Sequence, residues 1–369
     1  MIKSKKILFK LNYLYHLPAL EPVIEIFSFD KNYDVAVTLS FDFDYQFGII
    51  RKKKNKDYLS SFLSKNVRIA EKNEKFDVTF VSDVIENSSS QNNLLCMVYH
   101  GPIINKSVTF RELRKHKKDE YLIFVESQYA VNKLTDADCL GLSQTKIVGF
   151  PKMDPIINNK FDKRKILFEL GLDEKKKTIL YAPTYKPTSL YELKDEIFHA
   201  TKDYNLIIKL HHYSWMGKYA SRNQSRIIKN KVSQFDHAIL MPRDYYNITP
   251  LYAVADTLIS EASGAISEFL ITNKVGIIYD LNDNKLKHTD DEPLLLHENE
   301  FLKKSFIHIN SPSQLKDAIH YALAPSKNIL DNVKKDKMKY FDICDGKASV
   351  RIKSTIDDIL SKEVNANTV

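Results

Sequence analysis

Cysteine, tryptophan and glycine are all scarce in this 369-residue chain, with three, one and nine copies. The cysteines, Cys96, Cys139 and Cys344, are widely spaced and form no CxxC pair, which argues against a cysteine metal site. An odd number of cysteines without a recognisable signal peptide fits reduced thiols in a cytosol. No apolar run reaches the roughly 18 residues that a membrane-spanning helix needs, so we expect no such helix.

The composition is otherwise that of a soluble globular protein, with 43% hydrophobic and 28% charged residues. Long disordered segments are not expected at this balance. The length suits two α/β domains, each able to bury a core of its own.

The chain is basic, with a net charge of +8, and basic residues gather at Arg51–Lys56 and Arg111–Lys118. Nucleic acid, an anionic membrane surface or a phosphorylated substrate would each account for the charge, and so would ordinary solvated faces. We find no recognisable nucleic-acid-binding module. Aromatic residues near the first cluster favour peripheral docking on anionic lipid.

Short β-branched or aromatic runs alternate with amphipathic stretches along the first half of the chain. This alternation is typical of parallel sheets covered by helices. Apolar spacing predicts helices over Leu20–Phe27 and Tyr58–Lys72. The predicted strands are Ile7–Leu11, Asp34–Leu39, Val78–Val81, Leu94–Tyr99, Tyr121–Val125 and Lys146–Gly149.

The segment Gly149–Pro155 holds a glycine and two prolines, which predict a linker. After it the alternation restarts, and we expect two doubly wound halves with a cleft between them, with ligands at the carboxyl ends of the strands. Closing helices are predicted over Ser313–Leu323 and Ala348–Ser361. The predicted strands here are Thr178–Tyr181, Leu206–Leu210, Ala238–Met241, Thr257–Ile259, Val275–Tyr279 and Phe306–Ile309.

The segment Ala253–Leu270 reads as a buried strand followed by a helix that begins near Ser263. Free backbone N–H groups and the helix dipole favour an anion there, and the small residues Gly264 and Ala265 allow a phosphate to approach. Ser263 suits an N-cap or a hydroxyl donor to phosphate. Glu268, about one turn into the helix, is placed to accept hydrogen bonds from a ribose. A plain capped helix is the simpler alternative.

His100 directly follows a predicted strand and precedes Gly101 and Pro102. A histidine at the carboxyl edge of a sheet points toward a ligand, and its ordinary pKa near 6.5 suits removal of a hydroxyl proton. A hydrogen-bonded structural histidine is the alternative.

Two further strands end in basic residues. If the strand at 206–210 continued, Lys209 and His211 would share one face and could neutralise a pyrophosphate, because side chains alternate along a strand. A zinc site made by His211 and His212 is not expected, because adjacent strand residues face opposite ways and no other ligand pattern joins them. Lys186, after the strand at 178–181, is either a phosphate contact or a solvated loop lysine.

In this order, these segments resemble the motifs of the CDP-glycerol glycerophosphotransferase family of teichoic-acid and capsule synthesis. The resemblance spans about residues 95–355. In the first half of this span, Tyr99–Gly101 is similar to the family's Trp-His-Gly motif, Gly149–Asp154 to its Gly-x-Pro-Arg-x-Asp motif, and Tyr181–Lys186 to its Tyr-Ala-Pro-Thr-Trp-Arg motif. In the second half, Lys209–His211 is similar to the family's Arg-x-His motif, Glu261–Glu268 to its Asp-Tyr-Ser-Ser motif and the acid that follows it, and Asp345–Arg351 to its Asp-Gly-x-x-x-x-Arg motif.

The resemblance implies a GT-B fold without an obligatory tightly bound cofactor. It implies attack by an acceptor hydroxyl on the β-phosphorus of a CDP-alditol, glycerol or ribitol, with CMP leaving. Positioning and charge stabilisation dominate such chemistry. The implied roles are a general base for His100, pyrophosphate stabilisation for Lys209 and His211, phosphate binding for Ser263 and Gly264, ribose binding for Glu268, supporting cations for Lys152 and Lys186, and site closure for Arg351.

We therefore expect residues 1–155 to form an acceptor-side domain, 156–345 a donor-binding domain, and 346–369 a helix returning to the first domain. The expected acceptor is a lipid-linked or polymeric glycan at the inner face of the cell membrane, reached by a cytoplasmic, peripheral enzyme. Nucleic acid is not an expected partner. The alternatives are a GT-B glycosyltransferase that uses a UDP- or CMP-activated sugar, and an inactive scaffold of the same fold.

Overall fold

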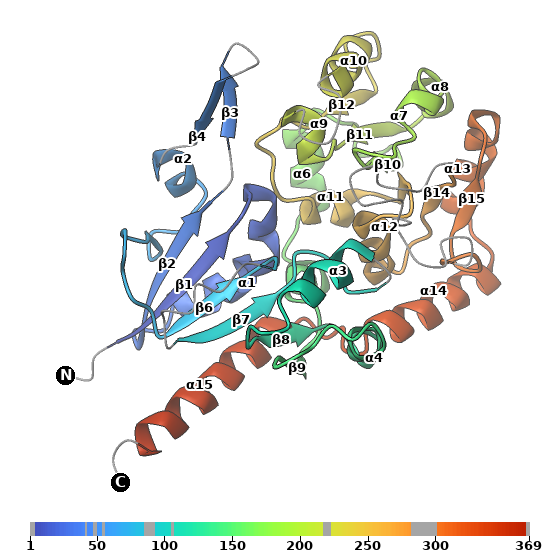
Figure 1. Cartoon of the computed structure of the whole chain (residues 1–369). Coiled ribbons are helices and arrows are strands. Elements are labelled where there is room, and N and C mark those ends of the chain that lie inside the picture. The colour runs from blue at the N-terminus through green and yellow to red at the C-terminus, as the bar shows by residue number, and fades with distance from the viewer. Residues whose placement is uncertain are drawn as a thin grey trace. The chain divides into compact units, whose positions relative to one another are not determined.

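The computed structural model describes residues 4–40, 43–46, 50–53, 56–84, 93–104, 107–216, 223–281 and 301–366. The chain forms two compact units. Unit 1 comprises residues 1–104, 109–158 and 341–369, and unit 2 comprises residues 105–108 and 159–340. Both units are coloured by residue number in Figure 1.

Unit 1 is built on a seven-stranded sheet of order β5-β2-β1-β6-β7-β8-β9, in which every pairing is parallel. A separate antiparallel hairpin joins β3 (Phe43–Gln46) to β4 (Ile50–Lys53). The strands of the sheet are β1 (Lys5–Leu11), β2 (Tyr33–Leu39), β5 (Arg68–Ile69), β6 (Val78–Val81), β7 (Leu94–Val98), β8 (Leu122–Val125) and β9 (Gln144–Ile147).

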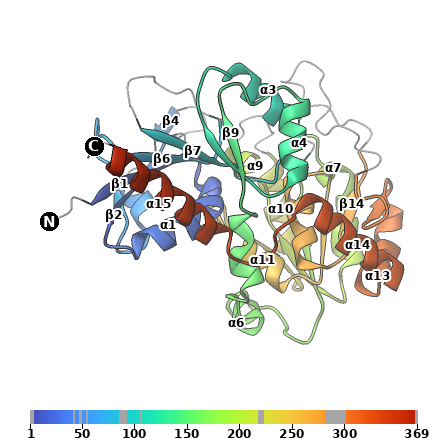
Figure 2. The same cartoon turned by 90° about the horizontal axis from the view of Figure 1, so that it is seen from below.

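Helices α1 (Leu17–Ser28) and α15 (Ala348–Ala366) lie side by side in unit 1, as Figures 1 and 2 show. The core beneath α1 is aromatic: the rings of Phe9 and Phe80 stack with centroids 4.9 Å apart, and Phe27 packs against both. The other helices are α2 (Lys56–Ser60), α3 (Ser107–Lys115, continuing from unit 2 into unit 1), α4 (Gln128–Asp136) and α5 (Asp154–Ile157), with 3-10 turns η1 (Leu14–His16) and η2 (Pro151–Met153).

Unit 2 contains a six-stranded parallel sheet of order β12-β11-β10-β13-β14-β15. Its central strands are buried along their whole length, which is why they read in the sequence as continuous apolar runs. The strands are β10 (Thr178–Tyr181), β11 (Asn205–Ile208), β12 (Ala238–Leu240), β13 (Thr257–Ser260), β14 (Ile277–Tyr279) and β15 (Ile307–Ile309).

The helices of unit 2 follow its strands in an alternating order, as expected of a doubly wound sheet. They are α6 (Lys163–Glu169), α7 (Leu190–Leu193), α8 (Glu196–Ala200), α9 (His212–Met216), α10 (Asn223–Val232), α11 (Thr249–Val254), α12 (Gly264–Phe269), α13 (Leu315–Leu323) and α14 (Lys327–Tyr340), with η3 (Leu270–Thr272) and η5 (Pro312–Gln314).

The predicted α/β class with parallel sheets is confirmed, and every predicted strand is present with small differences at its ends. The helix predicted over Tyr58–Lys72 is wrong. Helix α2 ends at Ser60, the backbone turns where the Val67 N–H donates to Ser64 O, and β5 then pairs with β2. The Arg68 side chain, which donates to Asp34 across this pair, favours the extended edge strand.

The predicted linker at Gly149–Pro155 is also wrong. This segment forms η2 and the start of α5, and Lys152 and Asp154 within it are buried in unit 1. Gly149 has φ +92°, and a Cβ at that position would lie 2.8 Å from the carbonyl oxygen of Ile343. The glycine therefore serves close packing, and the division between the units falls after Asn158.

Among the helices of the described ranges, none is long and apolar enough to cross a membrane.

Candidate functional site

His100 lies just beyond the carboxyl end of β7, as predicted. Its ring Nδ1 is 3.0 Å from the carbonyl oxygen of Ser82, and its backbone N–H donates to the same oxygen. Because a carbonyl oxygen only accepts, Nδ1 must be the donor in this contact. The neutral ring then carries its lone pair on Nε2, which is the form a general base requires.

Aromatic and polar side chains from neighbouring strands surround His100. The ring of His16, from η1 after β1, is parallel to that of His100 with centroids 4.2 Å apart. Tyr15 and Tyr99 contact the His100 ring at centroid distances of 5.8 and 4.4 Å. With Asp83, the two histidines form the one group of possible metal ligands found in the described residues, their ligand atoms lying within 4.8 Å of one another.

A buried carboxylate that no sequence motif marks holds the loop after His100. Glu126 directly follows β8, the neighbour of β7, and accepts a hydrogen bond from the Ile103 N–H at 2.5 Å. Burial raises the pKa of Glu126 to about 7, with a smaller contribution from the Asp342 charge. The only sequence signal is an acidic residue placed between a buried strand and Ser127, the N-cap of α4.

In unit 2, the helix start predicted at Ser263 is correct. Ser263 is the N-cap of α12, where its side chain accepts from the Ile266 N–H, and its Oγ is 2.9 Å from that of Ser260. At Gly264, a Cβ would meet no atom within 4 Å, so the backbone there faces open space. Ala265 occupies the same first turn.

Glu268 is buried within unit 2 and accepts a hydrogen bond of 2.8 Å from the Tyr252 hydroxyl. Burial and the adjacent Glu268 charge raise the pKa of Tyr252 well above its ordinary value, so Tyr252 remains a donor. The predicted contact of Glu268 with a ribose stays a prediction.

The loop after β10 is held by the buried carboxylate of Glu261. Its two oxygens accept from the N–H groups of Thr184 and Ser189 at 2.6 and 2.5 Å. Burial raises the pKa of Glu261, and these hydrogen bonds act in the opposite direction. Lys186 lies between these two residues in the sequence. Its loop is therefore held by an acid that directly follows another strand, β13.

Strand β11 ends at Ile208, so the premise that Lys209 and His211 alternate along a continuing strand is wrong. A helix, α9, begins at His212 instead. His211 Nδ1 accepts from the Tyr213 N–H at 3.2 Å, and its ring contacts that of Tyr185 with centroids 4.6 Å apart. His211 and the Lys186 loop are therefore brought together, while the Lys209 ammonium donates to Leu210 O.

Lys152 and Arg351 lie in unit 1, where residues of two sequence motifs, Gly149–Asp154 and Asp345–Arg351, form hydrogen bonds with each other. Asp154 accepts from the N–H groups of Ala348 and Ser349 and from the Ser349 hydroxyl, at 3.1, 2.8 and 2.8 Å. Arg351 donates to Val148 O and pairs with Asp345. These contacts give Arg351 a structural role, and its contact with a donor stays a prediction.

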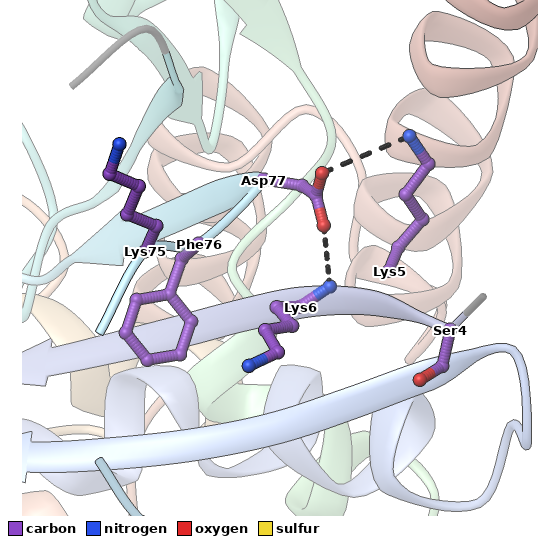
Figure 3. A pocket seen from close by; sticks show the side chains of 6 residues that line it. All are labelled: Ser4, Lys5, Lys6, Lys75, Phe76 and Asp77. Carbon is purple, nitrogen blue, oxygen red and sulfur yellow. Dashed lines mark hydrogen bonds and ion pairs between the residues drawn. The ribbon is translucent and has the colours of Figure 1, made fainter. Parts of the chain in front are cut away.

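A cavity of about 380 Å³ lies at the opposite, amino end of the first sheet, lined by Ser4, Lys5, Lys6, Lys75, Phe76 and Asp77. Figure 3 shows Asp77 paired with the backbone N–H of Lys6 and with the ammonium of Lys5. None of the predicted site residues lines this cavity.

Comparison with solved structures supports the fold. The chain is similar to the wall teichoic acid polymerase TagF in its H444N variant, with a TM-score of 0.74 and 14% identity over 98% of this chain and 90% of that chain. It is also similar to UDP-GlcNAc 2-epimerase from Neisseria meningitidis bound to UDP-GlcNAc, with a TM-score of 0.59 and 13% identity over 96% and 100% of the two chains. A search of curated proteins finds no match.

The family is established by a separate comparison with models of protein families. The model described as CDP-glycerol:poly(glycerophosphate) glycerophosphotransferase matches residues 98–358, which is well over half of the chain. This match covers His100 and all the motifs that carry the sequence resemblance. The chain therefore belongs to the CDP-glycerol:poly(glycerophosphate) glycerophosphotransferase family.

Proposed function

We propose that His100 is the general base of this enzyme, which transfers glycerol phosphate from CDP-glycerol to an acceptor hydroxyl. The observation that carries the proposal is the Nδ1 contact of His100 with Ser82 O. That contact places the lone pair of the neutral ring on Nε2, and a hydrogen-bonded Nδ1 fixes the direction in which it points.

In the proposed reaction, the acceptor hydroxyl gives its proton to His100 Nε2 while its oxygen attacks the β-phosphorus of the donor. A bond forms between that oxygen and phosphorus, the bond to the bridging oxygen breaks, and CMP leaves. Because phosphoryl transfer needs little covalent help from the protein, the remaining residues act by positioning and by neutralising charge.

The donor side of the proposal rests on unit 2. The Lys186 loop, Lys209, His211 and the Ser263–Ala265 turn follow β10, β11 and β13, which are adjacent in the sheet. Ligands of open α/β sheets bind at the carboxyl ends of such strands. We assign the phosphates to these residues and the ribose to Glu268. A TagF variant, H444N, was solved after soaking with CDPG, which agrees with a donor of this kind.

Unit 1 is then the acceptor side, and we assign it a glycan or glycan-lipid acceptor at the inner face of a membrane. Three cations at and after the end of α3, Arg114, Lys115 and Lys118, are exposed. Exposed cations attract anionic lipid. The earlier cluster at Arg51–Lys56 lies partly outside the described residues, and its side chains are not described.

The test is release of CMP from CDP-glycerol by the purified chain with a glycan-lipid acceptor. CDP-ribitol, a UDP-sugar and a CMP-sugar serve as parallel donors. We expect release from CDP-glycerol and a fall of about 100- to 10,000-fold in His100→Ala, the range that general bases contribute. His320→Gln, on the exposed face of α13, is the matched control. Turnover of a sugar nucleotide alone would overturn the assignment in favour of a glycosyltransferase.

A further inference from the structure

A fully buried serine ends the strand that precedes the turn at Ser263–Ala265. Ser260 is the last residue of β13, and its side chain is screened from solvent. A hydroxyl that is buried without hydrogen-bond partners destabilises a fold, so a serine at this position needs partners inside the protein. Ser260 has two, and they belong to the loop after β10 and to the turn after β13, the two segments next to each other that we assign to the donor phosphates.

The first partner of Ser260 lies at the start of the loop after β10. The Ser260 hydroxyl donates to the carbonyl oxygen of Ala182 at 2.7 Å. Ala182 directly follows β10, which is the neighbour of β13 in the sheet. A carbonyl oxygen only accepts, so the single proton of the Ser260 hydroxyl is used in this contact. Ser260 therefore holds the beginning of the loop that carries Lys186.

The second partner of Ser260 is Ser263, the N-cap of α12. The Oγ atoms of the two serines are 2.9 Å apart. Because the Ser260 proton is directed to Ala182, the Ser263 hydroxyl must be the donor between the two serines. Ser263 Oγ also accepts from the Ile266 N–H at 3.3 Å. In this arrangement the proton of Ser263 is not available to a phosphate, and its hydroxyl connects the turn to β13.

The three residues Ser263, Ser260 and Ala182 form one hydrogen-bonded chain across the edge of the sheet, which we call the Ser260 link. Glu261 adds two hydrogen bonds from the same end of β13 to the loop. Those two contacts hold the loop, whereas the Ser260 hydroxyl bonds to both the loop and the turn. Water does not compete for these bonds, because Ser260 is fully buried.

We propose that Ser260 is a positioning residue that joins the loop after β10 to the turn after β13, so that a diphosphate meets both segments in one fixed arrangement. This inference rests on the proposed function, which assigns the donor phosphates to these segments. Ser260 does not touch the donor, since its side chain is buried. A diphosphate that contacts both segments depends on their spacing, whereas a single phosphate can bind one segment wherever the other lies. The link therefore strengthens the binding of CDP more than that of CMP, the product that must leave.

The test compares the binding of CDP and CMP by calorimetric titration of the full chain. We expect Ser260→Ala to weaken CDP binding about 10-fold, which corresponds to the loss of about one hydrogen bond, and CMP binding by less than about 3-fold. Ser267→Ala is the matched control. Ser267 is also buried, and its hydroxyl donates to Ser263 O at 2.9 Å, so this variant loses a hydrogen bond of the same turn without affecting the loop. We expect both of its affinities within about 2-fold of the wild type.

Two outcomes of the titration would overturn the proposal. Equal losses of CDP and CMP binding in Ser260→Ala would show a merely structural serine, because general damage to the turn weakens both ligands alike. Unchanged CDP binding would show that the link contributes nothing to the donor site. If Ser260→Ala does not fold, Ser260→Cys takes its place. Its thiol has a similar shape and is only a weak donor, so we expect a smaller loss with the same bias against CDP.

Hydrogen exchange followed by mass spectrometry tests the link without any ligand, because backbone amides exchange faster where local structure opens more readily. We expect faster exchange over residues 182–189 in Ser260→Ala than in the wild type, and wild-type exchange there in Ser267→Ala. Unchanged exchange over 182–189 in Ser260→Ala would overturn the link. If the wild type binds neither CDP nor CMP, the proposed function fails, while the exchange rates still decide whether Ser260 joins the two segments.

Discussion

The carboxylate of Glu261 accepts a hydrogen bond from the backbone of Ser189, a residue 72 positions earlier in the chain. Glu126 makes the corresponding contact in unit 1, where it accepts from Ile103. In both units, the acid follows a buried strand, precedes a serine N-cap, and holds the loop after a neighbouring strand. The loops so held carry Lys186 in unit 2 and immediately follow His100 in unit 1.

Glu126 makes the stability of unit 1 depend on pH. Its pKa in the folded state is about 7, above the ordinary value of about 4.3 in an unfolded chain. Between these values the folded state binds more protons than the unfolded state, so stability falls as pH rises from about 4.5 to 7, by about 3 kcal/mol in total. We expect Glu126→Gln, which stays neutral and still accepts from Ile103, to lose this dependence. Thermal unfolding measured from pH 5 to 8 checks it, and equal pH slopes in the two proteins would contradict it.

Removing the Glu261 side chain leaves the buried Ser189 N–H and the half-buried Thr184 N–H without their acceptor. The loss at a buried donor costs about 1–3 kcal/mol, so we expect Glu261→Ala to lower the free energy of unfolding by at least about 1–3 kcal/mol in urea. We also expect weaker CDP binding by calorimetry, because the Lys186 loop is no longer fixed. Glu192→Gln, which affects a partly buried contact to Tyr279 in the same unit, is the control and is expected to bind CDP normally.

Asp154 caps the amino end of α15 through Ala348 and Ser349. Loss of a capping side chain costs about 0.5–2 kcal/mol. We expect Asp154→Ala to lower the melting temperature by several degrees. Asp154→Asn, which can still accept hydrogen bonds, should recover most of that loss. Equal melting temperatures for the two variants would show that the cap contributes nothing.

Gly149 and Gly171 form a matched pair for testing backbone packing. Both have positive φ, +92° and +67°, but only at Gly149 would an added Cβ lie within 3 Å of another atom, the carbonyl oxygen of Ile343. The backbone strain of a non-glycine residue with such a positive φ costs about 1–2 kcal/mol by itself. We therefore expect Gly171→Ala to lose about that much stability in urea and Gly149→Ala clearly more. A larger loss at Gly171 would refute the packing argument.

The strands could be predicted because buried parallel strands are continuous apolar runs, as in Thr178–Tyr181. The start of α12 could be predicted because Ser263 is a strong local capping signal. The spacing of apolar residues gave the wrong prediction at Tyr58–Lys72, because the same residues also fit a short helix followed by a turn and an edge strand.

The acids Glu126 and Glu261 could not be assigned from the sequence, because their partners depend on which strands become neighbours. Strand β13 lies beside β10 although two other strands separate them in the chain. His16 was missed for the same reason, because only the sheet order brings the turn after β1 close to the end of β7. A contact that depends on the order of strands in the sheet cannot be predicted from the spacing of residues along the sequence.

Helix α15 belongs to unit 1 although it follows the whole of unit 2 in the chain. Residues 159–340 are continuous, so during synthesis unit 2 can complete its core while unit 1 still lacks the helix that packs against α1. Domains generally fold as units in the order in which they emerge. Here the half that begins first is finished last, so a chain cut after residue 340 would keep all of unit 2 and would leave one face of α1 uncovered in unit 1.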